Sequence, residues 1–292
     1  MKKILAVFLT LMISIVLFLL IQKRNEIITS PNKIQVAASF YPLYFFTKEI
    51  GGDKIEVINI TPAGAEPHDY ELTPQDVINI GQSKLLVLNG NLEPWGNKIT
   101  NDLKTKDIKV ITVGKEDNGD PHTWLSPAFA KVDSEKIADM LKTIDPKNSN
   151  YYSENETKLE KELEKINGDY KNGLKNCQTR TFVTSHEAFS YLATDYGLTQ
   201  VSIAGLSPDN EPSLNQLAAI TDVVKKNNVK FIFFESLASP KLAQTIANEV
   251  GAQTLVLDPI EGILPNDLSK GVNYLTLMEN NLQNLRKAME CK

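Results

Sequence analysis

The chain has 292 residues, of which 42% are apolar, so it is long enough for two ordinary domains and its composition argues against disorder. The net charge is −5. Four of the 31 basic residues and none of the 36 acidic residues lie in the first 25 positions, so the rest of the chain carries about −9. An acidic body argues against nucleic-acid binding, which needs basic surface to neutralise phosphates.

The N-terminal segment MKKILAVFLTLMISIVLFLLIQKRN places two lysines before an apolar run from Ile4 to Ile21. This pattern is typical of a secretory signal peptide or an N-terminal membrane anchor, and the length of the run favours an uncleaved anchor. No cysteine lies near residue 20, so no lipid-anchor site is expected. We assign residues 1–25 to this segment and expect the body of the protein outside the cytoplasmic membrane.

Short apolar strands alternate with helices from residue 33 onward. The first half predicts strands over 33–39, 54–60, 84–90 and 108–113, with helices over 42–51, 74–82 and 92–104. The second half predicts strands over 181–185, 198–204, 229–235 and 252–258, with helices over 187–196, 213–227, 240–250 and 269–289. This alternation predicts an α/β fold of two lobes, each a mainly parallel four-stranded sheet flanked by helices.

A long helix is predicted between the two lobes, after a helix over 127–144. Residues 147–174 carry a narrow apolar stripe on an otherwise charged helix: Tyr152, Leu159, Leu163, Ile166, Tyr170 and Leu174. We therefore predict an N-terminal lobe over 33–146, a rigid connecting helix over 147–174 and a C-terminal lobe over 175–292. A rigid connector favours small lobe movements over wide hinge closure.

The chain has two cysteines, Cys177 and Cys291. Outside the cytosol they could form a disulfide, and the alternative is two unrelated thiols. The sequence leaves both open.

The chain has only three histidines, and each follows the carboxyl end of a predicted strand. His68 lies in AEPHDYELTP, His122 in DPHTWLSP and His186 in TFVTSHEAF. Asp258, in LVLDPIEG, ends the last predicted strand, and Glu66 is a further possible oxygen ligand. Because ligands bind at the carboxyl edge of open α/β sheets, these residues are candidates for one site in the cleft between the lobes.

Helix-start patterns accompany the three histidines. Thr73 and Asp76 form a capping-box pattern after His68, and Ser126 precedes a proline after His122. Thr184 and Glu187 form another such pattern around His186. Taken singly, a histidine in such a place is more often a hydrogen-bonded residue than a ligand, and Asp258 could be a strand-end cap.

Three neutral imidazoles and one carboxylate form a four-coordinate site that suits Zn²⁺, with Mn²⁺, Co²⁺ or Fe²⁺ as further candidates. Since each imidazole must lose its proton to bind, affinity is expected to fall below about pH 6.5. The spacings of 54, 64 and 72 residues between the four exclude a zinc finger, whose ligands come in close pairs.

At these residues the chain resembles the metal-binding solute-binding proteins of bacterial ABC importers for zinc and manganese. The resemblance runs from about residue 34 to the C-terminus, through SFYPLYFFTKEIGGD, EPHDYELTPQD, DPHTWLSP, TSHEAFSYLATDYGL and FFES…LVLDP. It implies two lobes joined by one long helix and delivery of a metal ion to a membrane permease.

The resemblance also implies ligand roles for His68, His122 and His186, with Asp258 at the position of the carboxylate ligand. Zinc-type members carry histidine at the third position, where manganese-type members often carry glutamate, so His186 favours zinc. Some zinc-type members use water or a nearby glutamate as the fourth ligand. Many also have a histidine-rich loop before the second motif, and residues 114–120 contain no histidine.

We therefore predict a monomeric, non-enzymatic protein that captures Zn²⁺ and passes it to an ABC importer permease. One alternative is a manganese-binding member of the same class. A second is a secreted zinc hydrolase with Glu66 or Glu187 as general base, although the chain has no HExxH motif. A third is a metal-independent adhesin.

Overall fold

The computed structural model describes residues 33–114, 119–208 and 212–292. Contacts divide the chain into residues 1–33 and one compact unit over residues 34–292, to which the following description applies. The predicted signal peptide or anchor, residues 1–25, lies outside the described residues. Within the described ranges, no helix combines the length and the apolar character that crossing a membrane requires.

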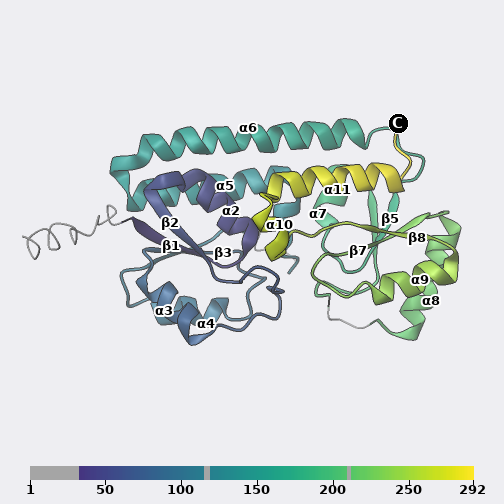
Figure 1. The fold of residues 1–292 in the computed structure, drawn as a ribbon, viewed down its shortest axis with the longest axis horizontal. Helices are drawn as coiled ribbons and strands as arrows, with labels where there is room; N and C mark the ends of the chain where they lie inside the picture. The colour runs from purple at the N-terminus through teal and green to yellow at the C-terminus, as the bar shows by residue number, and fades with distance from the viewer. Residues whose placement is uncertain (1–32, 115–118, 209–211) are drawn as a thin grey trace, which may run out of the picture. The chain divides into compact units, whose positions relative to one another are not determined.

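Two parallel four-stranded sheets form the centres of the two lobes (Figure 1). The first contains β1 (Ile34–Ala38), β2 (Ile55–Asn59), β3 (Leu85–Leu88) and β4 (Lys109–Thr112), in the order β2-β1-β3-β4. The second contains β5 (Thr181–Thr184), β6 (Thr199–Ser202), β7 (Phe231–Phe234) and β8 (Gln253–Val256), in the order β6-β5-β7-β8. Each strand lies within a predicted one, and the predicted fold class is confirmed.

Helices cover both faces of the first sheet: α2 (Tyr41–Gly51), α3 (Pro74–Gln82), α4 (Gly96–Leu103) and α5 (Pro127–Ile144). Successive side chains of a strand point to opposite faces, so both faces of a buried strand are apolar. In β3, Leu85 and Val87 join one core cluster with α2 and α5, whereas Leu86 and Leu88 join a second with α3 and α4.

The second sheet is covered in the same manner by α7 (Ser190–Asp195), α8 (Leu214–Lys226), α9 (Lys241–Val250) and α11 (Tyr274–Ala288), and the short helix α10 (Pro265–Ser269) precedes α11. The predicted last helix, 269–289, corresponds to α11 but begins too early, because Asn273 caps the helix and α11 starts at Tyr274. Short 3₁₀ helices lie over Gly52–Lys54, Thr123–Leu125 and Pro146–Asn148.

The connecting helix α6 (Ser149–Gly173) runs along both lobes (Figure 1). It packs against α2 and α5 of the first lobe and against α11 of the second. The predicted apolar stripe is buried: Tyr152, Leu159, Leu163, Ile166, Tyr170 and Leu174. Tyr170 Oη also donates a hydrogen bond of 2.8 Å to the carbonyl of Met278 in α11. The helix is therefore an integral wall of both lobes.

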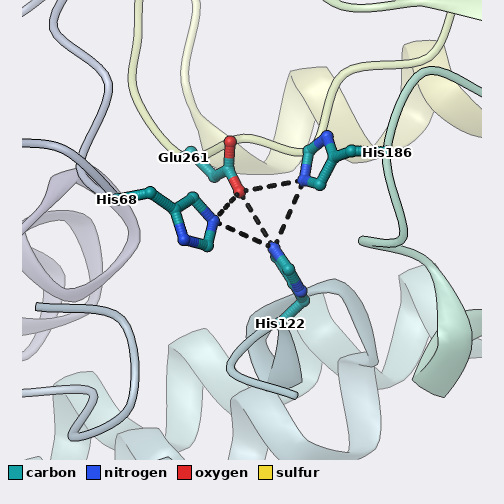
Figure 2. Close-up of side chains that lie close together, drawn as sticks. All are labelled: His68, His122, His186 and Glu261. Atoms are coloured by element: carbon teal, nitrogen blue, oxygen red, sulfur yellow. Dashed lines mark hydrogen bonds and ion pairs between the residues drawn. The ribbon is translucent and has the colours of Figure 1, made fainter. Parts of the chain in front are cut away.

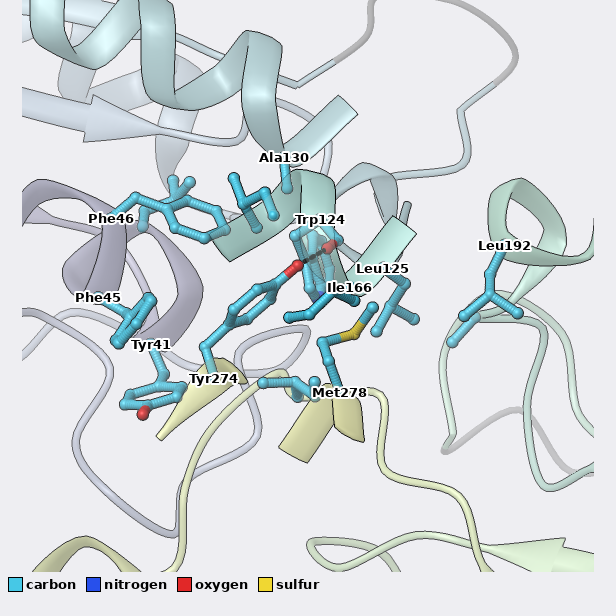
Figure 3. Close-up of a cluster of buried hydrophobic side chains, with 14 of the residues drawn as sticks. Tyr41, Phe45, Phe46, Trp124, Leu125, Ala130, Ile166, Leu192, Tyr274 and Met278 are labelled. Atoms are coloured by element: carbon cyan, nitrogen blue, oxygen red, sulfur yellow. Dashed lines mark hydrogen bonds between the residues drawn. The ribbon is translucent and has the colours of Figure 1, made fainter. Parts of the chain in front are cut away.

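One apolar cluster crosses the lobe boundary beneath α6 (Figure 3). Trp124, from the first lobe, is fully buried and donates from Nε1 to the carbonyl of Pro259 in the second, at 2.7 Å. Tyr274 Oη donates in the opposite direction, to the carbonyl of Trp124. This cluster thus belongs to both lobes, and the two hydrogen bonds across it hold the lobes in a defined position relative to one another.

Cys177 and Cys291 form a disulfide across 114 positions of sequence. A backbone hydrogen bond of 3.0 Å from Lys292 N to Asn176 O lies beside it. The bond therefore fastens the chain after α11 to the segment that follows α6.

Candidate metal centre

The loops that follow four of the strands carry the candidate donors. His68 lies between β2 and α3, where the predicted capping box of Thr73 and Asp76 is present. His122 directly precedes the 3₁₀ turn Thr123–Leu125, and Ser126 then caps α5 as predicted. These caps fix the ends of both loops and hence the directions from which the imidazoles enter.

The capping box predicted around His186 is wrong. Helix α7 begins only at Ser190, and Thr184 Oγ1 donates 2.7 Å to the carbonyl of His186. Gln200 donates to the same carbonyl at 3.0 Å. Residue 186 therefore ends a strand in a hydrogen-bonded turn, and this turn directs its side chain into the cleft.

The three histidines meet at one point together with Glu261 (Figure 2). Glu261 Oε1 lies 3.0 Å from His68 Nε2, 3.0 Å from His122 Nε2 and 3.3 Å from His186 Nε2. His122 Nε2 lies 3.3 Å from His68 Nε2 and 3.4 Å from His186 Nε2. One donor atom from each of the four residues therefore faces a common centre.

These five separations, of 3.0–3.4 Å, are close to the edges of a small tetrahedron. With zinc–ligand bonds of about 2.0–2.1 Å, a tetrahedral site has edges of about 3.3–3.4 Å. The side chains of His122, His186 and Glu261 are 0% exposed and that of His68 is 10% exposed. The group has the size, the donor types and the exclusion of water expected of a closed divalent-metal site.

A carboxylate holds the far side of two of the imidazoles. Asp120 Oδ1 accepts from His122 Nδ1 at 2.8 Å and from the His122 backbone N–H at 3.0 Å. Glu235 Oε1 accepts from His186 Nδ1 at 2.6 Å and from the His186 backbone N–H at 3.2 Å. These bonds occupy Nδ1 of both rings, so Nε2 is the ring nitrogen that faces the centre.

The charges in the site favour protonated imidazoles when no cation is bound. Burial lowers the pKa of His186, but Glu261 and Glu235 outweigh it and raise that pKa to about 10. Burial likewise lowers the pKa of His122, and bonds to Asp120 and Glu261 raise it above its usual value. For Glu261, burial raises the pKa, but the three histidines hold it well below the usual range. The carboxylate is therefore charged.

Glu261 Oε2 is buried and has no hydrogen-bond partner among the described residues. An ionised carboxylate out of water is costly unless a cation or donors compensate it. The centre thus has the electrostatic character of a cation site.

The family model of the zinc-uptake complex component A, periplasmic, called ZnuA, matches residues 36–288. The chain belongs to the ZnuA family.

Relatives in this family are similar over most of the chain. The high-affinity zinc uptake system protein ZnuA of Bacillus subtilis is 37% identical over 284 residues, which cover 89% of this chain and 89% of that protein. The zinc-binding lipoprotein AdcA of Streptococcus pneumoniae is 38% identical over 88% of this chain, which spans only 56% of AdcA. The crystal structure of the Zn(II)-bound ZnuA-like domain of the same AdcA is 39% identical, with a TM-score of 0.80, over 89% of this chain and all of that domain.

Two candidates from the sequence lie outside the group of four in this ZnuA-family chain. Asp258 was expected in the group, but its carboxylate instead accepts from Ser236 Oγ and, at 2.7 Å, from the backbone N–H of Ile260. The chain turns back after β8, and Glu261, three positions later, takes the place foreseen for Asp258.

Glu66, the alternative oxygen candidate, accepts from the backbone N–H of His68 at 3.3 Å. Its carboxylate holds the loop that carries His68, as Asp120 holds the backbone of His122 two positions further on. Burial, and secondly the charge of Glu261, raise the pKa of Glu66 to about 8.

Three residues in or beside this group were missed from the sequence: Asp120, Glu235 and Glu261. Signals for them exist. Asp120 stands two residues before a histidine, Glu235 directly follows the apolar strand β7, and Glu261 is the charged residue in the short apolar segment after Pro259. A buried charge at a strand end is rarely placed without a partner.

Proposed function

We propose that this chain captures Zn²⁺ between its two lobes, with His68, His122, His186 and Glu261 as ligands, and delivers it to the permease of an ABC importer. The observation that carries the proposal is the buried tetrahedral group of three Nε2 atoms and one carboxylate oxygen. The names of the relatives support the cargo, since both describe zinc proteins.

The choice of zinc over manganese follows from the donor set. Three imidazoles and one carboxylate suit the borderline softness of Zn²⁺ and its preference for four ligands. Mn²⁺ favours oxygen donors and larger coordination numbers. Glu261 replaces Asp258 in the proposed ligand set because Asp258 already accepts two hydrogen bonds within its own loop.

We place the protein outside the cytoplasmic membrane, with residues 1–25 as signal peptide or anchor. The working division is an N-terminal lobe over 33–146, the connector over 147–174 and a C-terminal lobe over 175–292. We propose that it acts as a monomer and without catalysis.

A zinc hydrolase is the weaker candidate. A catalytic zinc keeps one coordination position open for water or substrate, with three protein ligands in the others. Here Glu261 lies 3.0–3.3 Å from all three imidazole nitrogens and would fill that position.

The test is the metal content of the purified protein, followed by competition titration of Zn²⁺ against Mn²⁺ with a chromophoric chelator. We expect one zinc per chain and displacement of manganese by zinc. A triple variant with His68, His122 and His186 changed to alanine is the matched control and should bind neither. A protein that holds no metal, or that prefers manganese, contradicts the proposal.

Delivery needs a cellular measurement. Cells without this protein should accumulate less zinc from zinc-poor medium, and the wild-type chain should restore uptake where the triple variant does not. Equal restoration by both would contradict the transport role.

A further inference from the structure

The loop after β8 contains an unusual backbone conformation. Ile260 has φ = +56°, and it is fully buried. A β-branched residue rarely adopts this left-handed conformation, and it persists only where the surroundings impose it. Among the described residues it is the one β-branched residue with positive φ, and the next residue in the chain is Glu261.

Asp258 supplies the bond that reaches Ile260 directly. Its Oδ1 accepts the Ile260 N–H at 2.7 Å, which closes a turn over Pro259. Its Oδ2 accepts from Ser236 Oγ, a residue that follows β7. Asp258 is only 8% exposed, so water competes little for either of the hydrogen bonds to its carboxylate.

Two further contacts fix the base of the same turn. Asn281 of α11 accepts the Asp258 N–H at 2.8 Å and donates to the Asp258 carbonyl at 2.6 Å. Trp124 of the first lobe donates to the Pro259 carbonyl at 2.7 Å. The backbone of Asp258 is therefore immobilised, and its side chain can hold Ile260 against a fixed support.

Gly262 closes the turn on the other side of Glu261. A side chain there would lie 2.9 Å from Leu237 and 3.3 Å from the carbonyl of Ala65, which belongs to the loop of His68. Glu261 thus lies between Ile260, whose N–H is bound by Asp258, and the tightly packed Gly262. The direction of the Glu261 side chain therefore depends on the φ angle of Ile260.

We propose that Asp258 is a positioning residue for the metal centre: its carboxylate holds Ile260 in the left-handed conformation and so directs Glu261 toward the three imidazoles. This inference rests on the proposed function, since Glu261 must be a ligand. Without the hydrogen bond between Asp258 and Ile260, Ile260 returns to negative φ and the Glu261 carboxylate turns away from the centre.

The test measures Zn²⁺ affinity of the full chain by chelator competition in five proteins: wild type, Asp258→Ala, Asp258→Asn, Glu261→Gln and Asp258→Ala/Glu261→Gln. Asp258→Ala should lower affinity about 10–100-fold, the range for outer-sphere partners. Asp258→Asn keeps an acceptor for the Ile260 N–H and should stay within about threefold of wild type. In the Glu261→Gln background, Asp258→Ala should change affinity by less than about threefold.

The outcomes separate three cases. A loss above about 100-fold in Asp258→Asn makes Asp258 a direct ligand and overturns the inference. A full loss from Asp258→Ala in the Glu261→Gln background, or no loss in the wild-type background, also overturns it while the zinc site stands. Wild-type affinity in Glu261→Gln removes that residue from the ligand set and overturns the inference together with that part of the proposed function.

If Asp258→Ala does not fold, Ser236→Ala tests the positioning role of Asp258 instead. It removes the second anchor of the same carboxylate and deletes only one oxygen. We expect a loss of about 3–10-fold that disappears in the Glu261→Gln background. No loss in Ser236→Ala would then overturn the inference.

Discussion

The two lobes share one sheet topology but hold their donors in different ways. The first lobe presents two imidazoles, His68 and His122, on loops that end in capped helices. The second presents His186 at the end of β5 and Glu261 on a loop with a left-handed isoleucine. Lobes with the same topology therefore contribute different donors, because the one carboxylate in the group of four, Glu261, comes from the second lobe.

The lobes are alike in the support of their buried imidazoles. Asp120 in the first lobe and Glu235 in the second each bind the ring and the backbone of one histidine. They differ again at the periphery, where the disulfide fastens the second lobe alone. Substitutions in matched pairs can therefore separate what the lobes share from what they do not.

The largest effects are expected from two single variants, each of which removes one imidazole, the first from the N-terminal lobe and the second from the C-terminal lobe. His122→Ala and His186→Ala should each lower zinc affinity by more than about 100-fold, because loss of an outer partner alone costs 10–100-fold. Chelator competition measures the affinity, and the gain in melting temperature on adding zinc should shrink in parallel. Exposed Glu187→Gln, beside His186, is the control. If one of the two alanine variants kept wild-type affinity, that histidine would be removed from the proposed ligand set.

Removal of the disulfide should follow in size and should affect stability alone. The double variant Cys177→Ser/Cys291→Ser loses a cross-link over 114 positions, which is worth about 2–5 kcal/mol of unfolding free energy. Denaturant unfolding with and without reductant measures the loss. Zinc affinity should stay within about threefold, and a large fall in it would show that the peripheral bond shapes the centre.

The two supporting carboxylates offer a matched pair across the lobes. Asp120→Asn and Glu235→Gln should each lower zinc affinity by about 10–100-fold, because the imidazole loses its orientation and some of its basicity. Titration of both variants under one set of conditions tests whether the supports are equivalent. A loss confined to one variant would show that a single lobe sets the affinity.

Acid should weaken zinc binding, and more through His186 than through His122. The pKa of His186 is raised to about 10 and that of His122 is also raised, so zinc must displace protons from the imidazoles even above neutral pH. Affinity should therefore rise by about tenfold or more per pH unit between pH 6 and 8. Glu235→Gln should flatten this dependence, since it removes one cause of the shift. Affinity independent of pH would contradict protonated imidazoles in the free site.

The smallest effect concerns a buried carboxylate of each lobe. Burial raises the pKa of Asp133 to about 7, and Thr123 Oγ1 donates a hydrogen bond of 3.3 Å to its carboxylate. A carboxyl group whose pKa is raised in the folded state destabilises the folded protein as the pH rises from about 4 to about 7. Asp133→Asn should therefore be more stable than wild type at pH 8 by at least about 1.4 kcal/mol, the equivalent of a single pKa unit, and show no gain at pH 4.

Thermal unfolding at the two pH values measures this gain. Asp258 is the counterpart in the second lobe, with its pKa raised to about 6 by burial. Because two donors bind its carboxylate, Asp258→Asn should bring no such gain. Equal gains in both variants would show that burial alone governs them.

Much of the fold could be predicted from the sequence because its cause is local. The strands are short apolar runs between helix-start signals, and all eight lie where periodicity places them. The three histidines could be placed at the carboxyl edges of the two sheets, because strand ends share an edge in a parallel sheet and ligands bind there. The start of the last helix was placed five residues too early, at 269 and not at Tyr274, although Gly271 and the capping residue Asn273 mark the true start.

The fourth member of the group could not be predicted from the same rule. Strand-end logic selects Asp258, which directly follows the last strand, but the direction of the next three residues depends on contacts from Ser236, Asn281 and Trp124. These partners lie 22 or more positions away in sequence. Periodicity carries no information on such long-range bonds, so Glu261 becomes evident only in three dimensions.

The apolar cluster under α6 has a consequence for how the metal is met. Pulling the halves apart would bring Trp124 and Tyr274, both fully buried, into water. We therefore expect the two lobes to stay together without metal, with the four side chains of the candidate site already close to one another. Little of the free energy of metal binding is then needed to bring the lobes together, so selectivity depends on how well the ion fits the donor atoms.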